Sequence, residues 1–453
     1  GIGEKIENLE VFHPDRIANR ILGMGDVVTL VEKAAKEVDE KEAKELQEKF
    51  LKGRFTLLDY YKQLEQLTKM GGFEGILKYL PGMSGLKEKV EKTAAGFMEI
   101  GVREGTPVTW VLPTRIETIV ASLALSRIGA VQNPIIHIYR EREVGFCVRQ
   151  TGSELVLVPG EWNGFDYREM VKNSTADMKS PPNIVQIYDS LPEGNPLELS
   201  EEVVLAPDEP IRWIYYTSGT TSDPKGAMHT DSTLIAGGVG LAKALNMGEK
   251  DIGSIAFPYA HIGGPDYLVC MLADGFPAVL IEKFDLESTI ETYKRHGVTM
   301  AGGSTAFYSM FLGAQRQQPQ KPLIPSLRLL SGGGAPKPPE IYYEVSQEMG
   351  IPVAHGYGMT ESPMICQGSP QDDPDQLAHT EGKPVFGAEV TIVRPDGSAC
   401  EAGEEGQVAV GGPQLFKGYK DPDLNNEAFD SLGRFLTGDL GVMREDGHVS
   451  VTG

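Results

Sequence analysis

Residues 216–226 read Tyr-Thr-Ser-Gly-Thr-Thr-Ser-Asp-Pro-Lys-Gly and follow directly on the apolar run Ile211–Tyr216. The run has the β-branched and aromatic composition of a buried strand. The stretch after it combines hydroxyl side chains with two glycines and one lysine, so it can direct backbone N–H groups and hydroxyls at a polyphosphate, with Lys225 as a mobile counter-charge. It is not a Walker A loop, because Pro224 stands where that motif has Gly before its Lys. The alternative interpretation is a polar surface turn.

Helical and strand patterns alternate on both sides of this loop, from a helix beginning near Leu86 and the helical run Ile116–Ile128 onward. Such alternation predicts an α/β fold with parallel sheets covered by helices over residues 86–385. After about residue 385 the helical patterns thin out, which predicts a small β-rich subdomain over residues 386–453. The expected strands are 108–112, 131–135, 154–158, 211–216, 252–257, 278–281, 298–301, 327–330, 352–355, 389–393, 406–410, 434–437 and 449–451.

Two further segments follow expected strands. Ser331-Gly-Gly-Gly-Ala335 comes directly after the strand at 327–330, and three consecutive glycines let a planar ligand approach bare backbone. A flexible turn is the equally open alternative. Leu436-Thr-Gly-Asp439 places a carboxylate at the end of the strand at 434–437, where it could accept hydrogen bonds from a diol.

The segment His355-Gly-Tyr-Gly-Met-Thr-Glu361 follows the expected strand at 352–355. Tyr357, between two glycines, can present its ring face to a planar ligand. Thr360 offers a hydroxyl, and Glu361 offers the hard oxygen ligand that Mg²⁺ prefers.

In this order and spacing, the four segments resemble the adenylate-forming superfamily of acyl-CoA synthetases, luciferases and peptide-synthetase adenylation domains. The resemblance covers roughly residues 86–453. It implies an ATP-dependent carboxylate–CoA ligase of the kind used in fatty-acid metabolism: a small carboxylic acid attacks the α-phosphorus of ATP and releases pyrophosphate, and the thiolate of CoA then displaces AMP. ATP, Mg²⁺ and CoA are the cofactors and co-substrates implied. An adenylation domain that loads a carrier protein is the alternative within this class.

The resemblance also assigns roles to individual residues. The predicted phosphate loop comprises Thr217, Ser218, Gly219, Thr220, Thr221 and Lys225. The predicted adenine and ribose contacts are Gly333, Gly334, Ala335, Tyr357, Gly358 and Asp439. Thr360 is expected to contact the α-phosphate, and Glu361 is the predicted Mg²⁺ ligand. The residues expected to be catalytic are Lys225, His261, Thr360 and Glu361.

His261, within Phe257-Pro-Tyr-Ala-His-Ile-Gly-Gly264, matches the family's position beside the carboxylate and the acyl tunnel. The alternative is a core histidine bonded to a backbone partner. By family position, His261–Gly264 and Gly302–Thr305 edge the acyl pocket, and their small residues leave room for a medium-length, alicyclic or aromatic acid.

The sequence departs from the family pattern in places. Ser222 stands where the family usually has Gly. The family's hinge arginine should follow Gly453, and its catalytic lysine lies in a C-terminal domain beyond that point. We therefore expect that domain to be absent from this chain, ATP binding to be weak and thioester formation to be impaired.

Residues 1–83 have a different character. Helical patterns predict an all-α segment, and Leu9–Phe12, Arg20–Asp26, Lys69–Gly71 and Leu80–Met83 resemble the signal-recognition-particle GTPase, at the junction of its GTPase and methionine-rich domains. That resemblance implies a signal-peptide or targeting module, without the GTP-binding loops or RNA-binding helices. The abrupt change near Ser84 favours an accidental join of two unrelated stretches. A natural fusion, whose apolar segment would shield a fatty substrate, is the alternative.

Composition limits the remaining classes. The chain has 453 residues, of which 40% are hydrophobic and 23% charged, as expected for a globular protein of two or three domains. Its net charge of -22 disfavours a nucleic-acid partner. No run approaches the roughly 20 apolar residues of a membrane helix. The absence of a signal peptide and the wide separation of the cysteines predict a cytoplasmic protein with free thiols. The cysteines are Cys147, Cys270, Cys366 and Cys400. The sequence gives no indication of oligomeric state.

Overall fold

The structure is a computed structural model that describes residues 84–199, 209–217 and 223–453. The predicted all-α segment and the predicted phosphate-loop residues Ser218, Gly219, Thr220 and Thr221 lie outside the described residues. The chain divides into two compact units, residues 1–90 and 91–453. Helix α6 (Ser84–Glu99) begins in the first unit, and the elements below all belong to the second.

The first sheet of the second unit has the strand order β6-β3-β1-β2-β7-β8. Its strands are parallel except for β8, which pairs antiparallel with β7. Strand β3 reads Leu-Val-Leu-Val and is buried at every position, as expected for a parallel strand covered on both faces. The strands are β1 (Pro107–Trp110), β2 (Val131–Pro134), β3 (Leu155–Val158), β6 (Asn183–Gln186), β7 (Trp213–Tyr216) and β8 (Gly226–His229). The associated elements are α7 (Ile116–Arg127), α8 (Glu141–Thr151), α9 (Tyr167–Ser174), η2 (Pro196–Glu198) and the hairpin β4 (Glu161–Trp162) and β5 (Phe165–Asp166).

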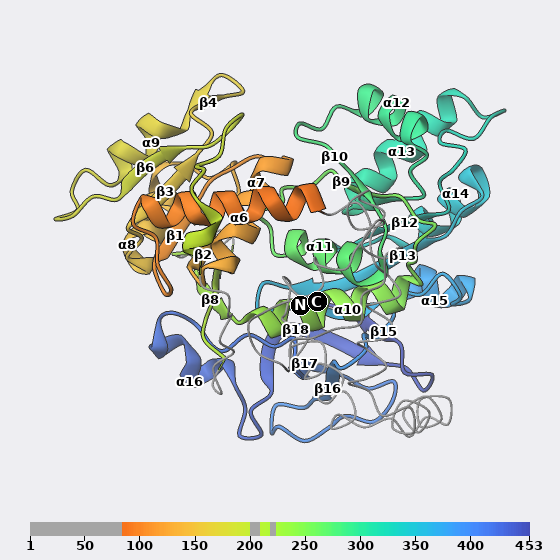
Figure 1. Ribbon diagram of the computed structural model, residues 1–453. Coiled ribbons are helices and arrows are strands. Elements are labelled where there is room, and N and C mark those ends of the chain that lie inside the picture. Colours follow the sequence, from red (N-terminus) through yellow and green to blue (C-terminus); the bar gives the residue numbers. More distant parts are fainter. Residues whose placement is uncertain (1–83, 200–208, 218–222) are drawn as a thin grey trace, which may run out of the picture. The chain divides into compact units, whose positions relative to one another are not determined.

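A second sheet has the order β11-β12-β13-β14-β15, with β11 to β13 parallel and β14 and β15 antiparallel. A short parallel pair, β9 and β10, packs beside β11. The strands are β9 (Gly253–Ile255), β10 (Ala278–Leu280), β11 (Met300–Gly303), β12 (Leu329–Gly332), β13 (Val353–Met359), β14 (Ser362–Gln367) and β15 (Lys383–Pro384). The helices are α10 (Asp231–Leu245), α11 (Gly263–Asp274), α12 (Leu286–His296), α13 (Thr305–Gln317), α14 (Pro339–Met349) and α15 (Pro374–His379). Helix α10 packs against α11 and β14, and Figure 1 shows α10 and α11 between the first two sheets.

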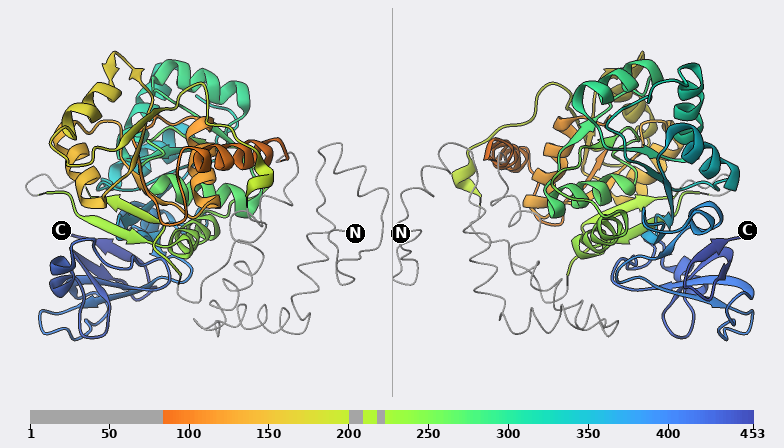
Figure 2. Two further views of the ribbon diagram at one scale, coloured as in Figure 1. Left: turned by 60° about the vertical axis from the view of Figure 1, so that its left-hand side comes forward. Right: turned by 90° about the vertical axis from the view of Figure 1, so that its right-hand side faces the viewer.

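The third sheet is antiparallel and forms the β-rich subdomain, drawn in blue in Figure 2. Its elements are β16 (Glu389–Val393), β17 (Glu405–Gly411), η3 (Pro422–Leu424), α16 (Asn425–Ala428), β18 (Phe435–Met443) and β19 (Val449–Val451). A cluster of aromatic rings packs against β18: the ring centroid of Phe416 lies 5.4 Å from that of the partly buried Phe429 and 5.1 Å from that of Phe435. The cluster carries Tyr419, whose ring centroid is 4.9 Å from that of Phe416.

The sequence-based strands are confirmed, but two predicted site residues lie elsewhere than expected. Tyr357, predicted to follow a strand, lies inside β13, and Asp439, predicted at a strand end, lies inside β18. The glycines around Tyr357 suggest a loop, yet they are needed for close strand packing: a Cβ at Gly358 would lie 2.1 Å from the carbonyl oxygen of Pro363 in β14. The sheets are also mixed rather than purely parallel, because β8 and β14 return beside their predecessors after short connections.

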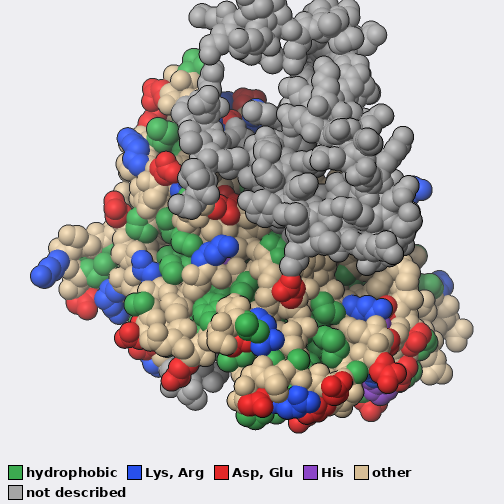
Figure 3. All heavy atoms as spheres, turned by 90° about the horizontal axis from the view of Figure 1, so that it is seen from below, with side chains coloured by type: hydrophobic (Ala, Val, Ile, Leu, Met, Phe, Trp, Pro, Cys, Tyr) green, Lys and Arg blue, Asp and Glu red, His purple; other side chains and the backbone are tan. Residues whose placement is uncertain are grey.

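Charges of both signs lie on the surface of the β-rich subdomain. Arg394 pairs with Glu404, and Arg444 reaches Asp375 of α15 at 2.8 Å. Figure 3, which views this face from below, shows Lys and Arg side chains interspersed with Asp and Glu. None of the helices in the described ranges has the length and apolar composition needed to span a membrane.

Candidate active site

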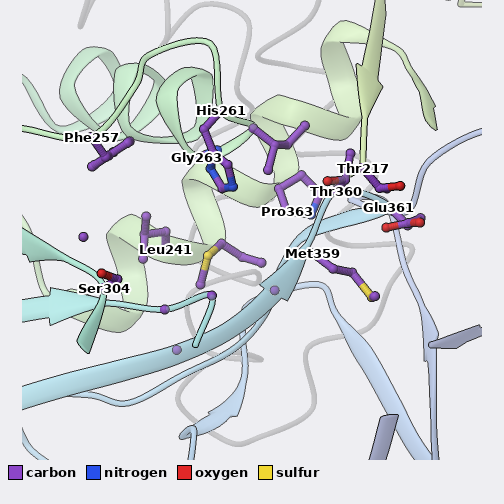
Figure 4. A pocket seen from close by; sticks show the side chains of 18 of the residues that line it. Thr217, Leu241, Phe257, His261, Gly263, Ser304, Met359, Thr360, Glu361 and Pro363 are labelled. Carbon is purple, nitrogen blue, oxygen red and sulfur yellow. The ribbon is translucent and has the colours of Figure 1, made fainter. Parts of the chain in front are cut away.

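A cavity of about 1540 Å³ lies where the three sheets of the second unit approach one another. Its walls come from the segments after β2 and β7, from α10 and α11, from β11 to β14, and from the β-rich subdomain. The volume exceeds the roughly 300–1,000 Å³ that is typical of a pocket for one small ligand. Figure 4 shows two ends: Thr217, Thr360 and Glu361 lie together at one, and Leu241 and Phe257 lie at the other.

The polar end is held by the base of the loop after β7. The backbone N–H of Thr217 donates to the carbonyl of Lys225 at 3.0 Å, and the N–H of Lys225 donates to Oγ1 of Thr217 at 3.3 Å. These two bonds fix both ends of the predicted phosphate loop. The Lys225 side chain is exposed, and its Nζ lies 5.6 Å from the ring centroid of Tyr419, within cation–π range.

Glu361 is a buried carboxylate at the same end, 5% exposed. The Tyr419 hydroxyl donates to its Oε1 at 2.5 Å, and its own carbonyl accepts from the N–H of Phe416 at 2.8 Å. Burial raises the pKa of Glu361, and the hydrogen bond from Tyr419 opposes part of that rise. A carboxylate held away from water in this way gains from a cation beside it.

A cation at Glu361 would need ligands from outside the protein. Within the described ranges, no group of three or more His, Cys, Asp or Glu side chains could hold a metal ion. Mg²⁺ commonly takes one or two carboxylates and completes its shell with waters and substrate phosphates. One buried carboxylate beside Thr217, Thr360 and Lys225 fits a Mg²⁺ that arrives with a polyphosphate.

Replacing Glu361 with glutamine keeps the shape of the side chain and removes the charge. We expect the Mg²⁺ concentration that half-saturates ATP binding to rise by about tenfold or more, because a charge-assisted contact contributes about 1.5–3 kcal/mol. Calorimetric titration of Mg²⁺ at fixed ATP measures the change. Glu389→Gln, at an exposed position in β16, is the matched control. Superimposable curves for Glu361→Gln and the unsubstituted chain would remove Glu361 from the metal site.

Two buried histidines fix the backbone of two predicted site segments. Nε2 of His229 lies 2.8 Å from the carbonyl oxygen of Thr360, and Nε2 of His355 lies 2.9 Å from that of Ala335. A carbonyl only accepts, so Nε2 carries the proton in both rings. Burial lowers the pKa of each ring to about 4, which keeps both neutral near pH 7. No spacing in the sequence points to these roles, because each histidine sits singly on a strand.

The predicted adenine and ribose residues are only partly brought together. Gly333, Gly334 and Gly358 line the cavity, whereas Ala335, Tyr357 and Asp439 are not among its lining residues. The Tyr357 hydroxyl donates to Oδ2 of Asp439 at 2.5 Å, and burial raises the pKa of that phenol. Thr437 and Gly438, the neighbours of Asp439, line the cavity in its place.

His261 lies between the two ends of the cavity (Figure 4). Its ring is exposed to the cavity, and its Nδ1 accepts from the N–H of Gly263 at 3.1 Å. His261 therefore has the backbone partner that the alternative interpretation supposed, but its ring faces the cavity instead of the core. Of the residues predicted to edge the acyl pocket, six line the cavity: His261, Ile262, Gly263, Gly302, Gly303 and Ser304. Gly264 and Thr305 do not.

Sequence reasoning missed Tyr419 and most of the apolar end. Tyr419 lies in the segment Phe416-Lys-Gly-Tyr419, whose aromatic and glycine residues give only a weak signal. The apolar lining comes from helices, strands and loops far apart in the chain: Leu241, Leu245, Met247, Phe257, Tyr267, Met300, Phe307 and Met364. Each of these residues, taken alone, is of a type that is common at ordinary core positions.

Comparison with protein families gives two matches. The model of the family described as AMP-binding enzyme matches residues 84–420, and that of the family described as Signal peptide binding domain matches residues 36–100.

Relatives and solved structures resemble most of the chain. A 2-succinylbenzoate–CoA ligase of Bacillus subtilis is 31% identical over 353 residues, which cover 77% of this chain and 68% of the relative. A medium-chain fatty-acid–CoA ligase of Escherichia coli is 26% identical, over 78% of this chain and 64% of the relative. The structure of O-succinylbenzoate coenzyme A synthetase from Bacillus subtilis in complex with ATP and magnesium ion superposes with a TM-score of 0.69 and 28% identity, covering 82% of this chain and 74% of that one. ATP-bound MatB from Rhodopseudomonas palustris gives a TM-score of 0.72 and 25% identity, over 82% and 73% of the two chains.

Proposed function

The chain belongs to the AMP-binding enzyme family, and on this premise we propose that it activates a carboxylic acid with ATP and passes the acyl group to CoA. The observation that carries the proposal is the division of one cavity into two ends. Thr217 and Glu361 lie together at the polar end (Figure 4), Lys225 reaches the same end beside Tyr419, and the other end is apolar. A single cavity of this kind holds a nucleotide and an acid side by side, as acyl adenylate formation requires.

The residues at the polar end would orient and stabilise the reacting phosphate. The hydroxyls of Thr217 and Thr360 donate to phosphate oxygens, and Lys225 offsets the negative charge that spreads over them in the transition state. Mg²⁺, held by Glu361 and phosphate oxygens, would neutralise further charge. An oxygen of the substrate carboxylate, placed beside His261, forms the bond to the α-phosphorus as the bond to pyrophosphate breaks.

Replacing Lys225 with alanine should weaken ATP binding by about 1.5–3 kcal/mol, roughly 10- to 150-fold in the dissociation constant, because a charge-assisted hydrogen bond is lost. Isothermal titration of Mg-ATP into both proteins measures the effect. Lys420→Ala is the control. Lys420 is exposed, directly follows Tyr419 in the sequence and does not line the cavity. Equal affinities for Lys225→Ala and the unsubstituted chain would overturn the phosphate-loop assignment.

The overall reaction is tested with the full chain, Mg-ATP and a panel of carboxylic acids. Acid-dependent release of pyrophosphate, with acyl hydroxamate formed on adding hydroxylamine, is the expected result. Acyl transfer is then compared between CoA and a phosphopantetheinylated carrier protein, since an adenylation domain would prefer the latter. Failure of every acid in the panel to stimulate release of pyrophosphate, together with undetectable ATP binding, would reject the proposal.

A second candidate function concerns residues 36–100, which match the family described as Signal peptide binding domain. We propose that this segment binds an apolar signal sequence. A fluorescent signal peptide is titrated with the full chain, with a scrambled peptide bearing charges in its apolar run as the control. Equal anisotropy changes for the two peptides would argue against a signal-peptide site.

A further inference from the structure

The apolar end of the cavity has a wall that offers no charge to a substrate. Its side chains are Leu241 and Leu245 of α10, Met247, Phe257, Met300 of β11 and Phe307 of α13. Two polar side chains that line the cavity are bonded to backbone: the Ser254 hydroxyl donates to the carbonyl of Met300 at 3.2 Å, and Nε2 of Gln367 donates to the carbonyl of Ala354 at 3.0 Å. The hydroxyl of Ser304 also lies at this end, beside Leu241 (Figure 4), and is uncharged. A ligand group entering here therefore meets mostly hydrocarbon.

The charged groups lie elsewhere. Of the described residues that line the cavity, those with Asp, Glu, Lys or Arg side chains are Lys225, Glu361, Asp423 and Glu427. Lys225 and Glu361 both adjoin Tyr419. Asp423 and Glu427 belong to η3 and α16, and α16 is tied to the Tyr419 backbone by the side chain of Asn425 at 2.8 Å. All four charges thus belong to the polar end.

The floor of the apolar end is made of small residues. Gly302 and Gly303 of β11 have φ values of 139° and 143°, and a Cβ at Gly302 would lie within 1.9 Å of the carbonyl oxygen of Ser331. Glycine is therefore required at that position. Ala301 of the same strand lines the cavity with these glycines, and side chains this small take up little of its volume, which leaves room for more than a two- or three-carbon acid.

We infer that the acid is a monocarboxylate whose remainder is uncharged, apolar and at least as large as a cyclohexyl ring or a medium-length alkyl chain. The inference rests on the proposed function, and it narrows that function to one substrate class. A second carboxylate would be buried in the apolar end without a cation to pair with, which is strongly unfavourable. The inference therefore excludes malonate and 2-succinylbenzoate as substrates. Several of the relatives are named as ligases of 2-succinylbenzoate.

Acyl sulfamoyl adenosines, which mimic the acyl adenylate and do not react further, test the inference by calorimetry on the full chain. We expect the octanoyl and cyclohexanecarbonyl compounds to bind at least tenfold more tightly than the malonyl and 2-succinylbenzoyl compounds. Tighter or equal binding of a compound with a second carboxylate would overturn the inference and leave the proposed function intact. Failure of every compound, and of AMP, to bind would overturn the proposed function and the inference with it.

A substitution at Gly263 tests where in the cavity the acyl group binds. Gly263 is the first residue of α11, and a Cβ there would lie 3.4 Å from Nδ1 of His261 and 3.8 Å from the Phe257 ring. Gly263→Leu therefore extends into the cavity. Gly313→Leu is the control, because Gly313 lies on exposed α13 surface with no atom within 4 Å of its added Cβ.

The expected result for Gly263→Leu is a loss of at least tenfold in affinity for the octanoyl compound and less than a twofold change for the acetyl compound and AMP. Gly313→Leu should bind all three as the unsubstituted chain does. Unchanged octanoyl affinity in Gly263→Leu, or an equal loss for all three ligands with the circular dichroism spectrum retained, would show that the acyl group lies elsewhere.

Discussion

Replacing Phe416 with alanine should lower the free energy of unfolding by about 3–5 kcal/mol, the usual result of truncating a fully packed phenylalanine. Phe416 is 3% exposed, and its ring contacts those of Tyr419, Phe429 and Phe435. The cavity left behind would be walled by the rings of Tyr419, Phe429 and Phe435, which belong to the segments before η3 and after α16 and to β18, so few of them can collapse into it. Because Tyr419 holds Glu361, Mg-ATP affinity should fall as well.

Urea denaturation followed by circular dichroism measures the change in stability, and hydrogen exchange at β18 shows whether the loss is local to the β-rich subdomain. Phe416→Leu should lower the free energy of unfolding by less than Phe416→Ala does, since leucine refills part of the volume. Leu432→Ala, at a side chain that is 75% exposed in the same subdomain, should change stability by less than about 0.5 kcal/mol. An equal effect of Phe416→Ala and Leu432→Ala would show that the ring cluster is not packed as described.

Acidification from pH 6.5 towards pH 4 should destabilise the fold through His229 and His355. Burial lowers the pKa of each from 6.5 to about 4. In that window the unfolded chain binds protons that the folded chain does not, so stability falls as the pH is lowered. A shift of this size corresponds to about 3 kcal/mol for each histidine near pH 4. The loss of stability should be concentrated at the candidate active site, because the two rings hold the carbonyls of Thr360 and Ala335.

The measurement is the dependence of thermal stability on pH for the unsubstituted chain and for His229→Gln, whose amide can donate to the Thr360 carbonyl without titrating. Buried acids such as Glu361 and Asp266 have raised pKa values and act in the opposite direction, so the difference between the two proteins is the quantity compared. A smaller loss between pH 6.5 and 4 in His229→Gln is expected. His296→Gln, at an exposed position at the end of α12, is the control. Parallel curves for His229→Gln and the unsubstituted chain would exclude His229 as the source.

The elements that sequence reasoning located are those that a short, contiguous run of residues specifies. Strand β7 is a run of aromatic and β-branched residues that stops at a loop of hydroxyl residues, so both its position and its end could be predicted. The four motif segments were assigned to one site only through their resemblance to the adenylate-forming superfamily, because the strands beside them belong to three different sheets.

What could not be predicted depends on contacts across long stretches of chain. Tyr419 meets Glu361 across 58 residues, and Nε2 of His229 meets the Thr360 carbonyl across 131. Neither pair leaves a spacing in the sequence. Tyr357 was misplaced for a related reason: its flanking glycines suggest a loop until the close approach of β14 is known.

The two ends of the cavity are built from different parts of the fold, and this bears on how the protein can diversify. The polar end uses the loop after β7, the β13–β14 turn and the β-rich subdomain, whereas α10, β11 and α13 supply much of the apolar end. Effects of substitutions that share no partners tend to add independently. Substitutions at Leu241, Met247 and Phe307, selected in nature or in the laboratory, can therefore change which acid is bound. The chemistry at the nucleotide would stay the same.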